Sequence, residues 1–348
     1  MTQSTSQQSV SGVAIVRRPR RVRAFGFLAV TVVLLGVAIL SIKVGSRDVD
    51  WSDVFAVLAG DADGMNQAAV EKRIPRTLLA MLVGAGLGVA GAVMQGVTRN
   101  PLADPGILGV NMGASLAVVI GISYFGLAAA SSYIWIAILG AAAAAVFVYG
   151  VGSLGRGGAT PLKLALAGAA TSAALVSFVT AIVLGRNDVA DTVQSWRVGG
   201  VGGATYSSIE QVLPFLIVGF LISMASARGL NSLALGDDLA AGLGERVALV
   251  RGGASVGAII LCGAATAVAG PIAFVGLVIP HACRLIVGVD YRWLVPYSAV
   301  AGAVLLTVAD VIGRIVARPS EIDVGILTAL IGAPFFIYIV RRQKVGSL

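Results

Sequence analysis

Long apolar runs alternate with short polar segments along most of this 348-residue chain. Each helical crossing of a bilayer needs about 20 mainly apolar residues, and windows of that kind recur from Phe25 onward. The pattern predicts an all-α membrane protein with about ten transmembrane helices in one domain, residues 25–348, after a basic tail, residues 1–24. The predicted spans cover residues 25–44, 77–96, 106–124, 133–152, 162–184, 208–226, 248–269, 271–286, 293–313 and 324–340.

A shorter amphipathic pattern lies in the polar loop between the first two predicted spans. Trp51, Val54, Phe55 and Leu58 are spaced i, i+3, i+4 and i+7, which is typical of one face of a helix. The sequence therefore predicts a short helix that lies in the membrane interface at this loop.

The segment 227–250 is too polar for a span. Gly236 followed by Asp237 predicts the end of one helix and the N-cap of another, and Gly242 and Gly244 predict a further break. Two short helices with an apolar side would project into the cytoplasm and contact a partner by packing into its groove. The alternative is an ordinary loop resting on lipid headgroups. The predicted apolar side consists of Leu233, Leu235, Leu239 and Leu243.

The composition excludes a soluble protein. Hydrophobic residues make up 57% of the chain and charged residues 12%, whereas soluble globular domains contain about 25% charged residues. Cys262 and Cys283 are the only cysteines, and both lie in apolar segments, so they give no disulfide framework and no metal-ligand spacing. We expect both thiols to be small packing groups.

The net charge of +8 indicates contact with anionic lipid rather than with nucleic acid, because the cations are scattered between apolar runs. Several arginines precede the first span, which is longer than the apolar region of a secretory signal, so we expect an uncleaved span with a cytoplasmic tail. Cations are more frequent at the helix ends that this orientation places inside, and both termini are therefore expected in the cytoplasm. The basic outward loop 46–75 needs another explanation.

Candidate catalytic and nucleotide-binding motifs are weak. Gly86, Gly88 and Gly91 have the spacing of a dinucleotide fingerprint, but they lie inside an apolar span, where Gly84, Gly88 and Ala92 predict close helix packing. The chain contains no phosphate-binding loop of the G-x-x-x-x-G-K-[ST] type, no serine triad and no paired carboxylates, so we expect no enzymatic activity. His281, the single histidine, is expected to be structural.

Asp310 and Arg314 are the exception among largely uncharged spans. At i and i+4 they are expected to pair on one helix face near its outward end. A proton-driven transporter would need such a carboxylate near the bilayer midplane. The position near the helix end therefore favours bracing of the helix.

Several long segments carry a family resemblance: RIPRTLLA (73–80), GAVMQGVTRNPLADPGILGVNMGA (91–114), LALG (233–236), AGPIAFVGLVIPH (269–281), VAD (308–310) and GAPFF (332–336). These segments resemble the permease subunits of iron–siderophore and cobalamin ABC importers, the FecCD-type family, over about residues 44–342. The resemblance implies the architecture of a type II ABC importer permease in a bacterial cytoplasmic membrane. It also implies a second permease, identical or paralogous, two cytoplasmic ATPase subunits that bind ATP and Mg, and an extracytoplasmic substrate-binding protein. No cofactor is expected in this chain.

The resemblance also implies roles for particular residues. Arg73, Arg76 and Arg314 match outward arginines that receive glutamates of the binding protein, and Arg314 is expected to keep one edge exposed while Asp310 braces it. The ATPase contact maps onto 230–247, with Leu233, Leu235, Gly236, Leu239, Leu243 and Gly244. The pathway is implied along 162–184, where Thr171, Ser172, Ser177 and Thr180 give a mildly polar face, followed by a short helix near 191–200.

The expected function is ATP-driven import of an iron–siderophore chelate. A haem or cobalamin importer is the alternative within the family. An ion-driven secondary transporter and a non-transporting membrane scaffold are the alternatives outside it. Uptake that follows ATP rather than an ion gradient separates the importer from the secondary transporter.

Overall fold

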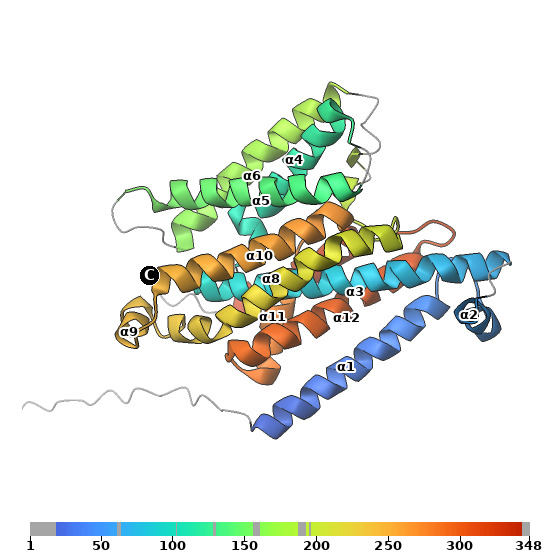
Figure 1. Ribbon diagram of the computed structural model, residues 1–348, viewed down its shortest axis with the longest axis horizontal. Helices are drawn as coiled ribbons and strands as arrows, with labels where there is room; N and C mark the ends of the chain where they lie inside the picture. Colours follow the sequence, from blue (N-terminus) through green and yellow to red (C-terminus); the bar gives the residue numbers. More distant parts are fainter. Residues whose placement is uncertain are drawn as a thin grey trace, which may run out of the picture.

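In the computed structural model, every regular element of the described residues is helical. The described residues are 19–60, 64–101, 103–127, 130–155, 161–186, 193–194 and 196–342. The helices are α1 (Arg20–Lys43), α2 (Trp51–Leu58), α3 (Met65–Thr98), η1 (Pro105–Leu108), α4 (Val110–Phe125), α5 (Ala130–Ser153), α6 (Pro161–Leu184), α8 (Tyr206–Leu233), α9 (Asp237–Gly242), α10 (Val247–Ala269), α11 (Val275–Val287), α12 (Tyr291–Val316) and α13 (Val324–Arg342) (Figure 1).

Each of the ten predicted spans coincides with a helix, and seven helices in the described part of the chain are long and apolar enough to cross a membrane. Helices α4, α11 and α13 are apolar but shorter. The predicted span 271–286 begins late, because Phe274 has a left-handed backbone (φ 69°) and α11 starts only at Val275. The 13 residues of α11 extend about 20 Å, less than the roughly 30 Å of a bilayer core. Most of the predicted basic tail lies outside the described residues. Of the predicted short helix near 191–200, residues 191, 192 and 195 lie outside the described residues, and residues 193–194 and 196–198 are helical.

Helix α3 runs through the centre of the bundle and packs against α8, α10, α11 and α12. A Cβ atom at Gly84 would clash with the carbonyl oxygen of Gly302 in α12, and one at Gly88 would clash with that of Ser298. A Cβ at Gly91 would likewise meet the backbone of Gly276 in α11. The glycines of α3 thus permit backbone-to-backbone packing, which confirms the interpretation of this motif as a helix-packing face.

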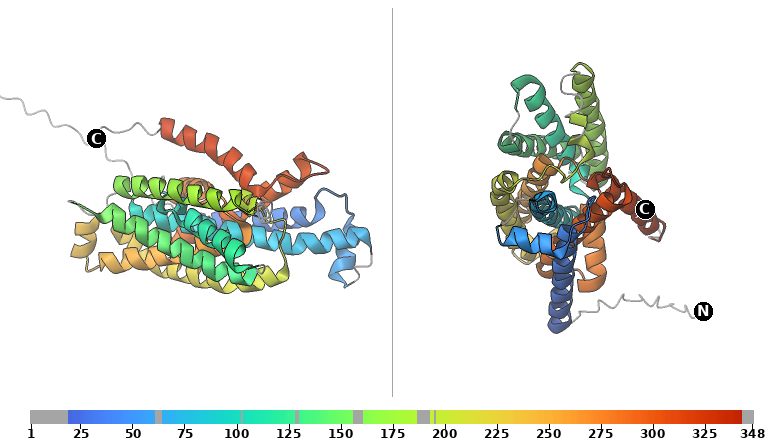
Figure 2. Two further views of the ribbon diagram at one scale, coloured as in Figure 1. Left: turned by 90° about the horizontal axis from the view of Figure 1, so that it is seen from above. Right: turned by 90° about the vertical axis from the view of Figure 1, so that its right-hand side faces the viewer.

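Four further helices pack around this centre, three as a group on one side and a single peripheral helix on another. Helices α4, α5 and α6 pack together on one side, where α5 and α4 contact α10 (Figures 1 and 2). Helix α1 lies along another side, contacts mainly α12, and leaves most of its apolar side chains exposed. Such exposure of a long apolar helix fits contact with lipid acyl chains.

The short helices α2 and α9 lie at opposite ends of the bundle (Figure 1). The predicted short helix at Trp51–Leu58 is present as α2, where Asp50 and Asp53 form a capping box. Val54 is buried against Val49 and Val70, while Phe55 remains exposed. We refer to the two extremities as the α2 end and the α9 end.

The substitution Gly84→Ala should destabilise the bundle, because the new methyl group must separate α3 from the backbone of α12. Overpacking of this kind costs about 1–3 kcal/mol, which a thermal melt of the detergent-solubilised protein detects as a lower Tm. Gly36→Ala on α1 is the matched control, since a Cβ there meets no atom within 4 Å. Equal Tm values for the two variants would contradict the close packing.

Candidate functional site

A buried ionic cluster lies at the α2 end. The predicted pair of Asp310 and Arg314 is confirmed, with 3.0 Å between Oδ2 and Nη2. Arg76 of α3 reaches the same carboxylate, with 2.8 Å between its Nη2 and Oδ1 of Asp310. Asp310 is fully buried and Arg314 is 1% exposed. One carboxylate of α12 thus joins two guanidinium groups from two helices.

The guanidinium of Arg314 also binds the end of α1. It donates to the carbonyl oxygens of Ser41, at 2.9 Å, and Val44, at 3.1 Å, and to the hydroxyl of Ser41, at 2.6 Å. The last carbonyl groups of a helix lack partners within the helix and carry partial negative charge. Arg314 therefore supplies both hydrogen bonds and positive charge to the C-terminal end of α1.

Arg73 of α3 also binds the C-terminal end of α1. Its guanidinium donates to the carbonyl oxygens of Ile42, Lys43 and Arg47, and the side chain is buried. Two arginines from two helices thus hold the end of α1, a helix in which only Leu34 and Ser41 are buried.

Arg76 extends from the buried cluster to its partly exposed rim. Its Nη1 lies 2.5 Å from Oε2 of Glu321 in the loop between α12 and α13, and Ser46 donates to the other oxygen of that carboxylate. Burial alone would raise the pKa of Glu321, but the hydrogen bond and charge of Arg76 lower this pKa below its ordinary value. Arg76 is the only member of the predicted arginine trio with an appreciably exposed side chain, at 14%.

Two of the three predicted docking arginines are buried in the structure. The expectation that Arg314 keeps one edge exposed is wrong, because its guanidinium contacts Asp310, Ser41 and Val44 inside the bundle and the residue is buried. Arg73 is also buried, at 6% exposure. The contribution of Glu321 and Ser41 was not visible in the sequence, since Glu321 is 245 residues from its partner Arg76 and Ser41 is 273 residues from its partner Arg314.

The second candidate site is the segment around α9 at the other end. Helix α8 ends at Leu233, and Gly236, with φ +108°, is the N-cap of α9. The prediction of Asp237 as the N-cap is therefore wrong, since Asp237 is the first residue of α9, and α9 is the one short helix between α8 and α10, a stretch described throughout, where two were predicted. Gly244, with φ +85°, follows α9. Leu235, Leu239 and Leu243 are exposed, at 58–67%. The prediction is wrong for Leu233, which is fully buried because it belongs to the last turn of α8.

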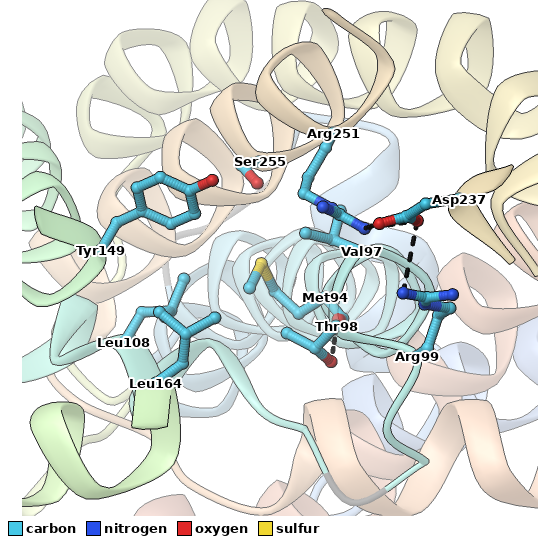
Figure 3. A pocket seen from close by; sticks show the side chains of 10 residues that line it. All are labelled: Met94, Val97, Thr98, Arg99, Leu108, Tyr149, Leu164, Asp237, Arg251 and Ser255. Atoms are coloured by element: carbon cyan, nitrogen blue, oxygen red, sulfur yellow. Dashed lines mark hydrogen bonds and ion pairs between the residues drawn. The ribbon is translucent and has the colours of Figure 1, made fainter. Parts of the chain in front are cut away.

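Asp237 is the most strongly paired residue of α9. Its Oδ1 lies 3.0 Å from Nη2 of Arg251 in α10 and 3.3 Å from Nη2 of Arg99, which follows α3 (Figure 3). A cavity of about 80 Å³ adjoins these three residues. Its other lining residues are Met94, Val97, Thr98, Leu108, Tyr149, Leu164 and Ser255.

A further polar cluster at the α9 end contacts the N-terminal part of α1 through Arg23. Asp290 caps α12 and accepts hydrogen bonds from Arg292 and from Asn231 of α8, while Arg23 of α1 lies 3.6 Å away. Burial would raise the pKa of Asp290, but these hydrogen bonds lower it to about 2. The carboxylate is therefore ionised throughout the physiological pH range.

The predicted polar side chains of α6 do not share one face. Residues five apart on a helix, such as Ser172 and Ser177, are rotated by about 140° relative to each other. Ser177 and Thr180 are exposed, and their hydroxyls donate to the carbonyl groups four residues earlier. Thr171 and Ser172 are half-buried.

The remaining candidates have structural surroundings. His281 packs edge-on against Phe335 of α13, with 5.9 Å between the ring centroids. Cys262 and Cys283 are buried free thiols, and Cys262 donates to the side-chain oxygen of Asn111, at 2.8 Å. Among the residues that the structure describes, no group of three or more His, Cys, Asp and Glu side chains is arranged to hold a metal ion.

Comparison with known proteins decides the family. The FecCD transport family matches residues 32–342. This chain belongs to the FecCD transport family. The family assignment agrees with the helical architecture and with the resemblance of the sequence motifs.

Individual relatives cover almost the whole chain. The iron(3+)-hydroxamate import system permease protein FhuB of Bacillus subtilis is 46% identical over 89% of this chain and 81% of its own length. The ferric enterobactin transport system permease protein FepD of Escherichia coli is 41% identical over 93% of this chain and 97% of its own. A solved structure of a metal-chelate type ABC transporter in an inward-facing conformation superposes with a TM-score of 0.79, at 26% identity, covering 92% of this chain and all of the other.

Replacing Arg314 by glutamine should destabilise the protein strongly, because it removes one partner of a buried ion pair and the donors at the end of α1. Removal of one partner of a buried pair costs about 3–5 kcal/mol, measurable by SDS-driven unfolding of the purified protein. Arg47→Gln is the control, since this exposed side chain makes no hydrogen bond or ion pair with the described residues. Similar stabilities for the two variants would contradict the assigned role of Arg314.

Proposed function

We propose that this chain is the permease subunit of an ATP-driven importer that carries an iron–siderophore chelate across the cytoplasmic membrane. The observation that supports it most is the similarity to iron-chelate import permeases over nearly the entire chain. Ferric siderophores are favoured as cargo over haem, because the hemin transport permease HmuU of Yersinia pestis has a lower identity, 36%. Cobalamin import is the other alternative in this family.

The α9 end is proposed to face the cytoplasm and to bind two ATPase subunits, together with a second permease, in the complete importer. Leu235, Leu239 and Leu243 expose apolar surface at the tip of the bundle, which suits insertion into a groove of a partner. Gly236 and Gly244 allow the bends on either side of α9. ATP and Mg are held by the ATPase subunits, and this chain contributes no catalytic residue and no cofactor.

Transport follows when ATP binding and hydrolysis displace α9. The displacement rocks the two permeases relative to each other, so that a cavity between them opens alternately to the two sides. Helix α6 suits the side of this pathway, because most of it is exposed in the single subunit. Ser177 and Thr180 provide polar groups without charge on its exposed face, while Thr171 and Ser172 lie deeper.

The α2 end is proposed to face outward and to receive an acidic substrate-binding protein. Of the implied docking residues, Arg76 is the one that reaches the rim, and Arg73 and Arg314 support it from beneath by fixing the end of α1. A guanidinium group binds carboxylates in two-pronged geometry, and its charge attracts an acidic partner through solution. This arrangement also gives a role to Arg73, one of the cations of the basic outward loop 46–75.

The substitution Leu239→Asp should uncouple transport, because a charge replaces apolar surface at the proposed ATPase contact. We expect loss of the copurified ATPase subunits, or loss of chelate-stimulated ATP hydrolysis in proteoliposomes, by about tenfold or more. Leu154→Asp is the control, since Leu154 is also exposed at the α9 end but lies outside α9. Normal stimulated hydrolysis in the Leu239 variant would count against the proposed coupling contact.

The same proteoliposomes test the class of transporter. Uptake of a ferric siderophore should require ATP inside the assembled complex and should survive an uncoupler. Uptake that persists without ATP and stops with the uncoupler would instead establish an ion-driven transporter.

Reversing the charge of Arg76 should weaken binding-protein docking, because Arg76→Glu places a carboxylate beside Glu321 and opposite an acidic partner. Affinity of the binding protein for the nanodisc-embedded importer should fall by about tenfold or more, measured by biolayer interferometry. Raising the salt concentration should weaken wild-type docking as well. Unchanged affinity in Arg76→Glu, with no effect of salt, would exclude docking at this end.

A further inference from the structure

The position of α9 depends on more than its covalent connections. A helix of six residues is too short to be stable by itself, since isolated helices need about 12–15 residues. Glycines with positive φ, Gly236 and Gly244, adjoin it, so the chain bends sharply on both sides. Its contact with the bundle must therefore come from side chains, and Ala240, an apolar residue of α9 itself, is fully buried against the core.

The ion pairs of Asp237 supply the remaining connection. The carboxylate begins α9, Arg99 follows the last turn of α3, and Arg251 lies near the start of α10. Oδ1 of Asp237 is shared between the two guanidinium groups, at 3.3 and 3.0 Å, and Oδ2 is 3.3 Å from Arg251 (Figure 3). A single carboxylate thus links α9 to the central helix of the bundle and to one of its neighbours.

The backbone of Arg99 strengthens this link. Arg99 adopts a left-handed conformation, with φ 52° and ψ 29°, and caps α3 through a hydrogen bond from its N–H to Gly96. The guanidinium is therefore attached directly to the end of α3 rather than to a long loop. A displacement of Asp237 acts on α3 through one side chain.

The surroundings show that these pairs contribute little to stability. The side chains of Arg99 and Asp237 are 42% and 41% exposed, and ion pairs that are open to solvent stabilise a protein by about 0–1 kcal/mol. The adjoining cavity of about 80 Å³ leaves room for the side chains to follow a movement. These contacts add little to the free energy of folding. We therefore expect their main effect to be on the position of α9 relative to α3 and α10.

We propose that Asp237 is a positioning residue that ties α9 to α3 and α10, so that movement of α9 is passed directly to the centre of the bundle. The inference rests on the proposed function, in which ATPase subunits displace α9. Without the carboxylate, α9 still binds the ATPase subunits through its exposed leucines. Its movement is then partly absorbed at Gly236 and Gly244 instead of reaching α3.

The test uses the whole importer, with ATPase subunits and binding protein, in proteoliposomes supplied with a ferric hydroxamate. For Asp237→Asn we expect normal copurification of the ATPase subunits, an unchanged Tm and continued ATP hydrolysis. The amount of chelate transported per ATP should fall by about fivefold or more, a typical lower bound for coupling between sites. Asp237→Glu, which keeps the charge, should retain most of the coupling.

Asp238→Asn is the matched control. Both aspartates lie in the first turn of α9, so each variant removes the same favourable charge near the helix N-terminus. Asp238 is exposed and forms no ion pair with the residues that the structure describes. Its substitution should therefore leave the ratio of transport to hydrolysis near the wild-type value.

Arg99→Gln and Arg251→Gln provide independent variants if Asp237→Asn assembles poorly. Each should lower the ratio in the same direction, and combining Arg99→Gln with Asp237→Asn should add less than the sum of the single effects, as expected for groups in contact. A wild-type ratio in Asp237→Asn overturns the proposal. Equal losses of transport, hydrolysis and ATPase copurification overturn it too, because they indicate a structural role. A wild-type importer that does not use ATP instead refutes the proposed function.

Discussion

The backbone-to-backbone contact between α3 and α12 is the constraint on which the rest of the bundle depends. Gly84 and Gly88 bring α3 against Gly302 and Ser298 so closely that a side chain at either glycine would collide with a carbonyl oxygen. Because lipid gives no hydrophobic driving force between helices, such close van der Waals packing is a principal source of helix association in a membrane. It places Arg76 of α3 beside the carboxylate of α12.

That juxtaposition explains how charged groups are accommodated at the α2 end. A buried carboxylate is costly unless it is paired and hydrogen-bonded, and Asp310 is paired with Arg76 and Arg314. The arginines are in excess, and their remaining donors bind the carbonyl groups at and after the end of α1. The carbonyl groups at the C-terminal end of α1, which lack partners within the helix, thus accept the hydrogen bonds that the excess arginines donate.

The two ends of the bundle are built differently. At the α2 end the guanidinium groups of Arg73 and Arg314 are buried and connect the end of α1 to the centre. At the α9 end Asp237 makes its pairs in partly exposed surroundings beside a cavity. In the proposed importer, the buried contacts would lie at the outward end and the more exposed pairs at the end that the ATPase subunits contact.

The sequence by itself determined the membrane class, the positions of the helices, the helix at Trp51–Leu58 and the pairing of Asp310 with Arg314, because these depend on apolar run length, local periodicity and i, i+4 spacing. The family also followed from local motifs. Only the tertiary structure decided that Arg314 and Leu233 are buried, that Arg76 shares Asp310, and that Asp237 bridges Arg99 and Arg251. The partners in these contacts are mostly tens to hundreds of residues apart in the chain, and the exposure of a side chain depends on which helices cover it. Periodicity along one helix carries no information about either.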